Sequence, residues 1–368
     1  MPQQYGKPKA PKFDSEARLC VSKESVQTRA ILLLISINLL AIGVNGQNAA
    51  SPKTDAALGS NNPNHKLEKE QELEVPFWTL EPGWDTQLEV RNNLAHGDLD
   101  ITPILRKADG SELQATALKI SSDAIKRVDL QSVAADWSGR ADAYGSLVLR
   151  YKSVSSGVYA AVLVQRKGHP ISFHFDAYPV SSQFSRGSRE SVWWLPHATS
   201  DGFLIISNFS SGRVQAEQIF TQGKNQYGTA IALAPHQTQR ISIREVVERA
   251  GFQPTQGGVK VDFVGGAGYV YVAEILFDES AEFSAIMKVF ERDPNARPGV
   301  YTLRAPLVGL ATPDPMLAYP AGTILHPNIL VRNAADITLG AEMIVNWRSS
   351  KSVGRFPLRL APLGVAHK

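Results

Sequence analysis

The sequence is almost free of cysteine: its 368 residues include one, Cys20. Without a second cysteine no internal disulfide can form, which excludes the small folds that depend on disulfides for stability. A chain exported without disulfides is more typical of bacteria than of animal secretion. Cys20 also precedes the apolar run at residues 30–44, whereas the lipid-bearing cysteine of a lipoprotein follows such a run.

An excess of one charge is lacking as well. Of the 38 bases and 35 acids, residues 1–46 hold six and three, which leaves 32 of each in the rest of the chain. The sequence pI near 8.8 therefore comes from the N-terminal segment. A nucleic-acid-binding protein would carry a basic face or stripe. We therefore expect no nucleic-acid partner.

Motifs of catalysis and cofactor binding are also missing. The sequence contains no HExxH, GxSxG or Walker-type pattern. We therefore predict a non-enzymatic protein with no catalytic, cofactor-binding or metal-binding residues. The glycine-rich stretch at residues 265–268 (GGAG) joins two strand patterns instead of opening a helix, which predicts a β-hairpin turn and not a phosphate loop.

Two groups of polar residues have the spacing of a site on one strand face. His174 and Asp176 are two residues apart and so point to the same side of a strand. Phe173 and Phe175 fill the opposite side, which favours a solvent-facing strand over a metal site or a catalytic triad. Residues 98–100 (DLD) are interpreted in the same way, because a calcium site needs more oxygen ligands.

Long apolar runs are limited to one, Ala30–Val44 (AILLLISINLLAIGV). It fits the apolar core of a signal peptide and falls short of the roughly 20 residues that span a bilayer as a helix. We predict a hydrophobic leader helix in a signal peptide at residues 1–46. The alternative is an uncleaved signal anchor with its N-terminus in the cytoplasm. Either way the rest of the chain is periplasmic, cell-surface or secreted, and touches the membrane only through this segment.

The pattern changes twice after the leader. Residues 47–73 lack apolar periodicity and are rich in polar residues, which predicts a flexible linker. From Glu74 onward, short alternating apolar runs are separated by turn residues. That spacing is typical of an all-β sandwich or barrel.

Internal repetition is visible in strand patterns that end in asparagine. LEVRN ends at Asn92, LIISN at Asn208 and ILVRN at Asn333, so the spacings are 116 and 125 residues. Later patterns recur in the same order, for example GSLVLRY at residues 145–151 and GGVKVDF at 257–263. A repeat of this length matches one immunoglobulin-sized sandwich, whose two sheets bury their facing residues.

The repeat predicts tandem units and one short helix in each of the first two. The helices are expected within Gln131–Trp137 and Arg244–Phe252, passing from one sheet to the other, with Gly251 ending the second. The strand patterns of the third unit stop at Lys368, and we favour truncation there. The alternatives are a half-unit that packs on the second unit or one that borrows strands from a partner. The predicted bounds are 74–190, 191–302 and, for the partial unit, 303–368.

Aromatic residues gather where the first two units begin. In the pairs Phe77-Trp78 and Trp193-Trp194, one ring is expected to face the core and the other to face outward. An outward ring packs against a neighbouring unit, contacts a partner or stacks on a sugar. Trp78, Trp193 and Trp194 are therefore candidate ligand or inter-domain contacts, and Trp84 lies near them in sequence.

The three strand-ending asparagines are predicted to be structural. Asparagine suits turns because it tolerates positive φ and hydrogen-bonds its own backbone. Asn92, Asn208 and Asn333 recur at equivalent places, which favours a shared turn over a shared ligand.

On these repeats, strand patterns and the leader, the chain resembles the tandem immunoglobulin-like or fibronectin-like β-sandwich proteins of bacterial cell envelopes. The resemblance covers residues 74–368 and lacks the Cys–Trp–Cys arrangement of true immunoglobulin domains. It implies an adhesive, binding or spacing role towards a protein or polysaccharide surface. The alternative is a carbohydrate-binding module or an accessory part of a carbohydrate-active enzyme.

Overall fold

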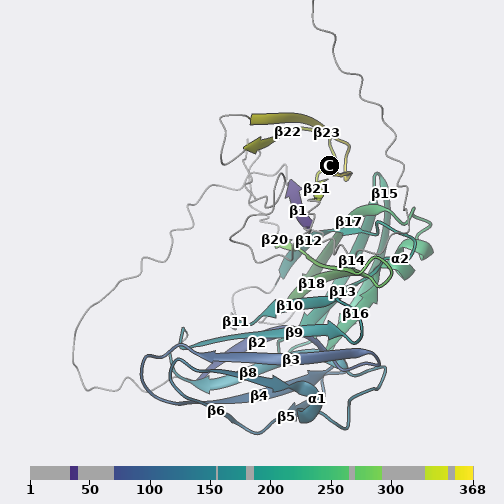
Figure 1. Ribbon diagram of the computed structural model, residues 1–368. Helices are drawn as coiled ribbons and strands as arrows, with labels where there is room; N and C mark the ends of the chain where they lie inside the picture. The colour runs from purple at the N-terminus through teal and green to yellow at the C-terminus, as the bar shows by residue number, and fades with distance from the viewer. Residues whose placement is uncertain are drawn as a thin grey trace, which may run out of the picture.

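The computed structural model describes residues 34–39, 70–154, 156–179, 186–264, 270–291, 328–346 and 353–367. Most of these residues form strands in several sheets, which confirms the predicted all-β class (Figure 1). Most of the predicted leader and linker, and the GGAG stretch at 265–268, lie outside the described residues.

The first unit consists of two antiparallel sheets, each named here by its first strand. The β2 sheet has the order β11-β2-β8-β4-β5, with β6 also paired to β4, and the β3 sheet has the order β10-β9-β3-β7. The bounds are β2 (Glu70–Thr79), β3 (Trp84–Asn92), β4 (Leu99–Lys107), β5 (Glu112–Gln114), β6 (Leu118–Ile120), β7 (Ile125–Asp129), β8 (Tyr144–Lys152), β9 (Val158–Arg166), β10 (Ser172–Asp176) and β11 (Tyr178–Pro179).

The second unit repeats this arrangement, with the single strand β15 in place of β5 and β6. Its β12 sheet has the order β20-β12-β17-β14-β15, and its β13 sheet has the order β19-β18-β13-β16. The strands are β12 (Arg186–Trp194), β13 (Asp201–Asn208), β14 (Val214–Gln222), β15 (Asn225–Leu233), β16 (Thr238–Ser242), β17 (Gln256–Val264), β18 (Val270–Asp278), β19 (Phe283–Met287) and β20 (Phe290–Glu291). The predicted repetition is therefore present in the topology. The first strands begin at Glu70 and Arg186, earlier than the predicted boundaries at 74 and 191.

Each of the first two units has one short helix that leads from the β3-type sheet back to the β2-type sheet, as predicted. The helices are α1 (Leu130–Val133) and α2 (Ile243–Arg249). Ser242 caps α2, because its side chain accepts a hydrogen bond from the Glu245 backbone N–H. Beyond the helix, Gly251 has φ +67°, a conformation that glycine adopts without strain and that stops a helix.

Two topological expectations are corrected. In immunoglobulin domains the first two strands share a sheet, whereas β2 and β3 lie in opposite sheets. The GGAG stretch was expected to form a hairpin, but the strands on either side of it, β17 and β18, also belong to opposite sheets. β17 and β18 therefore do not pair with each other as a hairpin.

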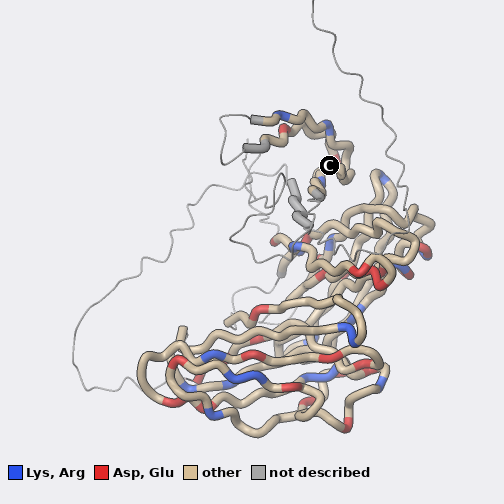
Figure 2. The backbone as a smooth tube through the Cα atoms, viewed as in Figure 1, with Lys and Arg blue, Asp and Glu red and all other residues tan. Residues whose placement is uncertain are grey.

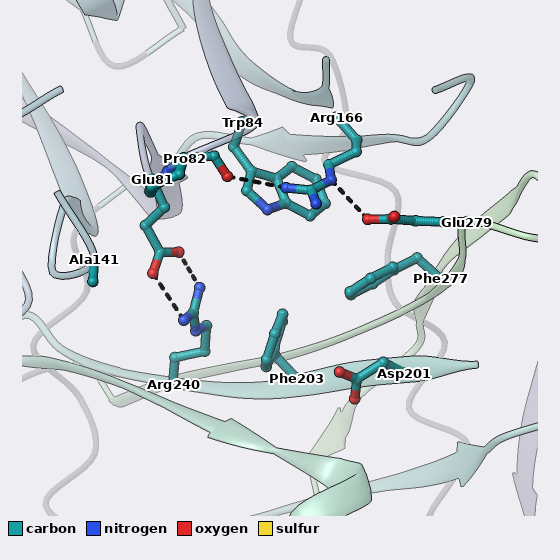
Figure 3. Close-up of a pocket in the computed structure, with 10 residues that line it drawn as sticks. All are labelled: Glu81, Pro82, Trp84, Ala141, Arg166, Asp201, Phe203, Arg240, Phe277 and Glu279. Carbon is teal, nitrogen blue, oxygen red and sulfur yellow. Dashed lines mark hydrogen bonds and ion pairs between the residues drawn. The ribbon is translucent and has the colours of Figure 1, made fainter. Parts of the chain in front are cut away.

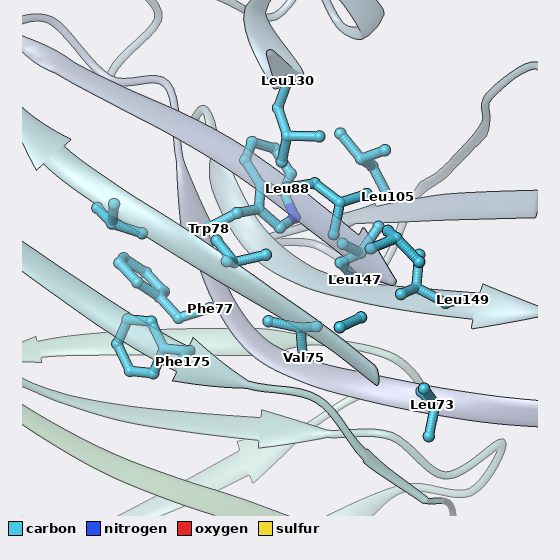
Figure 4. Packing of buried hydrophobic residues seen from close by; sticks show 14 of the residues in the cluster. Leu73, Val75, Phe77, Trp78, Leu88, Leu105, Leu130, Leu147, Leu149 and Phe175 are labelled. Carbon is cyan, nitrogen blue, oxygen red and sulfur yellow. The ribbon is translucent and has the colours of Figure 1, made fainter. Parts of the chain in front are cut away.

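Alternation along the strands explains the core of the first unit. Along β3, Leu88 and Val90 are buried, whereas Glu89 between them is half-buried, and Gln87 before them and Arg91 after them are exposed. The buried side chains of both sheets form one cluster (Figure 4). Burial of such apolar surface, at about 25 cal/mol per Å², holds the two layers together.

The described part of the third unit consists of β21 (Asn328–Asn333), β22 (Leu339–Asn346), β23 (Val353–Leu360) and β24 (Val365–His367). Residues Leu34–Leu39 form a strand, β1, parallel to β21, where a leader helix was predicted. β1 occupies the place beside β21 that antiparallel β18 occupies beside β13. Among the described residues, none of the helices combines the length and apolar character that a membrane span requires.

The second unit packs directly on the first, as Figure 1 shows. Along β13, Leu204, Ile205 and Ile206 are all fully buried, so both faces of this strand are covered. Leu204 and Ile206 belong to the core of their own unit, whereas Ile205 belongs to the cluster of the first unit. The β13 sheet is therefore a shared layer between two cores.

Charged residues of both signs are interspersed along the strands of the first unit (Figure 2). Several form cross-strand ion pairs, including Arg127 with Glu89 at 2.7 Å and Arg150 with Glu72 at 2.9 Å. Opposite charges facing each other across neighbouring strands support the sheet modestly.

Candidate functional site at the unit junctions

The junction between the first two units contains a pocket of about 350 Å³ that is open to the surface (Figure 3). Its walls come from the loop after β2, the ends of β3 and β9, and the strands β13, β16 and β18. It is therefore the place where side chains of both units converge.

Two ion pairs cross this junction in opposite directions. Arg240 of the second unit pairs with Glu81 of the first through both carboxylate oxygens, with an Nη2–Oε1 distance of 2.9 Å. Arg166 of the first unit pairs with Glu279 of the second, with an Nε–Oε1 distance of 2.7 Å. Because Glu81 is itself buried, its pairing with a forked guanidinium offsets the cost of removing the carboxylate from water.

Aromatic rings pack around the same arginines. The Trp84 ring lies 5.7 Å from Phe277 in an edge-to-face contact and 6.0 Å from Phe173, and the Arg166 guanidinium lies 5.2 Å from its centre. Arg240 lies over the Phe203 ring at 4.3 Å. Aromatic and cation–π contacts of this kind favour one relative orientation of the two units.

The charged groups of this pocket join the two units through ion pairs. Glu81 and Glu279 are held by arginines, and burial raises the pKa of the third carboxyl, Asp201, which also accepts a hydrogen bond from the Gly202 backbone N–H at 2.7 Å. None of the described lining residues is a serine, cysteine or histidine nucleophile. The two arginine–carboxylate pairs favour one orientation of the two units.

The second junction is built around one buried arginine. Arg332 of β21 enters the outer face of the β12 sheet and donates hydrogen bonds to the backbone oxygens of Ser191 at 3.1 Å and Val259 at 2.9 Å. Its guanidinium also pairs with Glu190 at 3.2 Å, and both side chains are almost completely buried. A Cβ atom on Gly258 would lie 2.3 Å from the Arg332 Nε, so glycine provides the space for this side chain.

A second carboxyl is buried near the same arginine. Glu274 of β18 is completely buried, and burial raises its pKa to about 8, against the opposing effect of the Arg332 charge. The folded chain therefore retains a proton on Glu274 where the unfolded chain, with the ordinary pKa of 4.5, has released it. The free energy of unfolding consequently falls as the pH rises from 4.5 to about 8, and then levels off.

We predict that Glu274→Gln removes this pH dependence. Across that pH window, the free energy of unfolding of the wild type should decline relative to that of the variant by up to about 1.4 kcal/mol per pH unit. Urea unfolding at a series of pH values measures the difference. Glu217→Gln, at an exposed position of β14, is the matched control and should follow the wild type. A difference between wild type and Glu274→Gln that is the same at every pH would contradict the prediction.

The three tryptophans predicted as ligand or inter-domain contacts lie in different environments. Trp78 lies in the core of the first unit, stacked on Trp137 at 5.9 Å, with its Nε1 donating to the Ser146 backbone oxygen at 2.7 Å. Trp193 is equally buried in the second unit. Trp194 touches His367 of β24 at 5.4 Å between ring centres, and is therefore an inter-unit contact.

The Phe77-Trp78 pair does not alternate between core and surface as expected. Both rings are buried in the same core. The register of β2 against β8 shifts between Val75 and Trp78. A β-bulge of this kind adds a residue and turns two successive side chains to one face.

The polar candidates lie on the surface. His174 and Asp176 face solvent while Phe173 and Phe175 are buried, as predicted, and the Tyr159 hydroxyl donates to Asp176 at 2.8 Å. At residues 98–100, Asp98 pairs with Lys119 at 3.3 Å. In the part of the chain that the structure describes, no three histidine, cysteine or acidic side chains gather closely enough to hold a metal ion.

The three asparagines make one repeated set of hydrogen bonds, and all are completely buried. Each donates from Nδ2 to backbone oxygens of two segments and accepts at Oδ1 from the backbone N–H two residues later. The predicted structural role is confirmed. None of the three has positive φ, so the reason is side-chain bonding and not a left-handed backbone.

The residues that join the units were not singled out from the sequence. Glu81, Arg240, Glu190 and Arg332 are charged residues without a motif, and their pairing depends on how two sheets meet. The sequence does contain one indication of the shared layer. Leu204–Ile206 is a continuous apolar run, whereas the equivalent Leu88–Val90 alternates between apolar and charged residues. Continuous apolar runs are typical of strands that are covered on both faces. Comparison with protein-family models, curated proteins and solved structures finds no match.

Proposed function

We propose that this protein is an exported, non-enzymatic β-sandwich repeat protein that serves as a binding or spacing element at the cell envelope. The observation that supports this most is the docking of one unit on the next through a shared sheet, in which Leu204, Ile205 and Ile206 of β13 are buried on both faces. Stacked units that share buried surface extend a chain in a defined direction, which a spacer or a presented binding surface requires. The units would be immunoglobulin-like in size and layering, although not in strand order.

Export is tested by following the full chain in cell fractions. The apolar run Ala30–Val44 is expected to direct the chain out of the cytoplasm, and a charged residue within that run disrupts such a segment. We expect wild-type protein in the envelope or the medium and Leu34→Arg protein in the cytoplasm. Wild-type protein that remains in the cytoplasm would refute the proposal.

A carbohydrate-binding role is the second candidate. One observation favours it: the ring of Trp84 lines a pocket that also contains paired polar side chains, and aromatic rings beside polar groups suit sugars. Pull-down with insoluble polysaccharides discriminates the two candidates. Retention of wild type that is lost in Trp84→Ala, but kept in Trp194→Ala at the other junction, would favour the sugar-binding role over the spacer.

A further inference from the structure

Two positions relative to the strand-ending asparagine make the contacts between units. The residue three places before it is Ile205 in the second unit and Leu330 in the third. Ile205 packs in the core cluster of the first unit, and Leu330 packs in that of the second. Both units therefore insert the same apolar position into the unit that precedes them.

The residue immediately before the asparagine makes the polar contact. In the second unit the Ser207 hydroxyl donates to the Pro76 backbone oxygen of β2 at 2.8 Å. In the third unit Arg332 donates to the Ser191 backbone oxygen of β12 at 3.1 Å. β2 and β12 are equivalent strands, so the two junctions use one docking geometry. The outer face of a β3-type sheet is the donor face, and the outer face of a β2-type sheet is the acceptor face.

The first unit has charged residues at both of these positions. They are Glu89, which pairs with Arg127 at 2.7 Å, and Arg91, which is exposed. Burying these charges against another sheet would remove them from water without the partners that a docked face needs. The donor face of the first unit is therefore polar. Terminal repeats of stacked arrays have a polar outer face of this kind.

The acceptor face can be followed through all three units at the sixth residue of one strand. In β4 this residue is Ile104, which is buried under Phe209 and Tyr271 of the second unit. In β14 it is Ile219, which is half-buried. In β22 it is Ile344, whose side chain is 45% exposed. The position is therefore buried under the second unit in β4, half-buried in β14 and most exposed in β22.

We propose that the units stack in one direction, that Glu89 and Arg91 cap the first unit against docking, and that the outer face of β22 around Ile344 is an acceptor for a further β-sandwich unit. That unit would carry an apolar residue three places before its strand-ending asparagine, because both existing junctions use one. The inference extends an interface already present in the chain and does not depend on the proposed envelope role.

The test replaces the two charged residues on the donor face of the first unit by those that make the contact in the second unit. The full-length variant Glu89→Ile with Arg91→Ser carries the residues of the second unit at both positions. We expect it to associate head to tail, with the first unit of one copy on the β22 face of the next. Light scattering of a dilution series should show that the mass of the variant rises with concentration. The mass of the wild type should not change with concentration through this contact. Adding Ile344→Lys to the variant should abolish the association.

A matched control distinguishes docking at this face from nonspecific association caused by the added isoleucine. Glu248→Ile with Arg249→Ser makes the same two changes at exposed positions of α2, away from both faces, and should behave as the wild type. A cap variant that keeps the wild-type mass at every concentration would overturn the proposal. Association that is unaffected by Ile344→Lys, or is equalled by the α2 control, would overturn it as well.

Discussion

Replacing Arg332 with methionine should weaken the attachment of the third unit by about 3–5 kcal/mol, because the change leaves the Glu190 carboxylate buried without its guanidinium. The pair is almost completely buried, with an Nη1–Oε2 distance of 3.2 Å. Amide hydrogen exchange measures the effect directly. The amides of β21 should exchange at least about a hundredfold faster than in the wild type, and those of β9 in the first unit should keep their rates.

The matching double variant separates the cost of an orphaned charge from the value of the pair. Arg332→Met together with Glu190→Met replaces both charges by apolar side chains of similar length, and such replacements are often neutral or stabilising. We therefore expect β21 exchange in the double variant to return most of the way to the wild-type rate. If it remains as fast as in Arg332→Met, the pair acts through packing and not through charge compensation.

Asn208→Ala should lower the free energy of unfolding by about 3 kcal/mol, since it removes three hydrogen bonds to buried and part-buried backbone groups. In the wild type, Nδ2 donates to the Gly212 and Ala234 backbone oxygens at 2.8 Å each, and Oδ1 accepts from the Ser210 N–H at 3.0 Å. Urea unfolding of the full chain measures the loss.

Asn225→Ala is the control for this prediction. Asn225 is exposed at the start of β15, so its replacement should change the free energy of unfolding by less than about 0.5 kcal/mol. Equal effects of the two substitutions would mean that the bonds of Asn208 are replaced by water and that the repeated asparagine is not a structural requirement.

Much of the fold could be predicted because strand alternation and repetition are local signals. LEVRN, LIISN and ILVRN end at asparagines that occupy one structural position. Both short helices lie where the strand alternation stops, and the second also has apolar residues at helical spacing. The order of strands in the sheets could not be predicted in this way. The sequence around residues 265–268 has strands on both sides, and only the tertiary structure decides whether they pair or pass to opposite layers.

The junctions were beyond prediction for a related reason. A charged residue such as Glu81 or Arg332 has the same appearance in the sequence whether it faces water or a partner across a sheet. Its role depends on contacts between residues far apart in the chain: Arg240 and Glu81 are 159 positions apart, and Arg332 and Ser191 are 141 apart. The β-bulge that turns both Phe77 and Trp78 inward likewise follows from pairing with β8 and not from the residues themselves.

Unfolding of the first two units, followed separately in one sample, tests most directly whether they form a docked stack. Fluorine NMR of fluorotryptophan-labelled protein reports on the first unit through Trp78 and on the second through Trp193, as urea is added. Because the units share a buried layer that includes Ile205, both signals should disappear in one coincident transition, and Arg240→Met should shift both together. Two separate transitions, with Trp78 unaffected by the loss of Trp193 structure, would show independent domains and contradict the account.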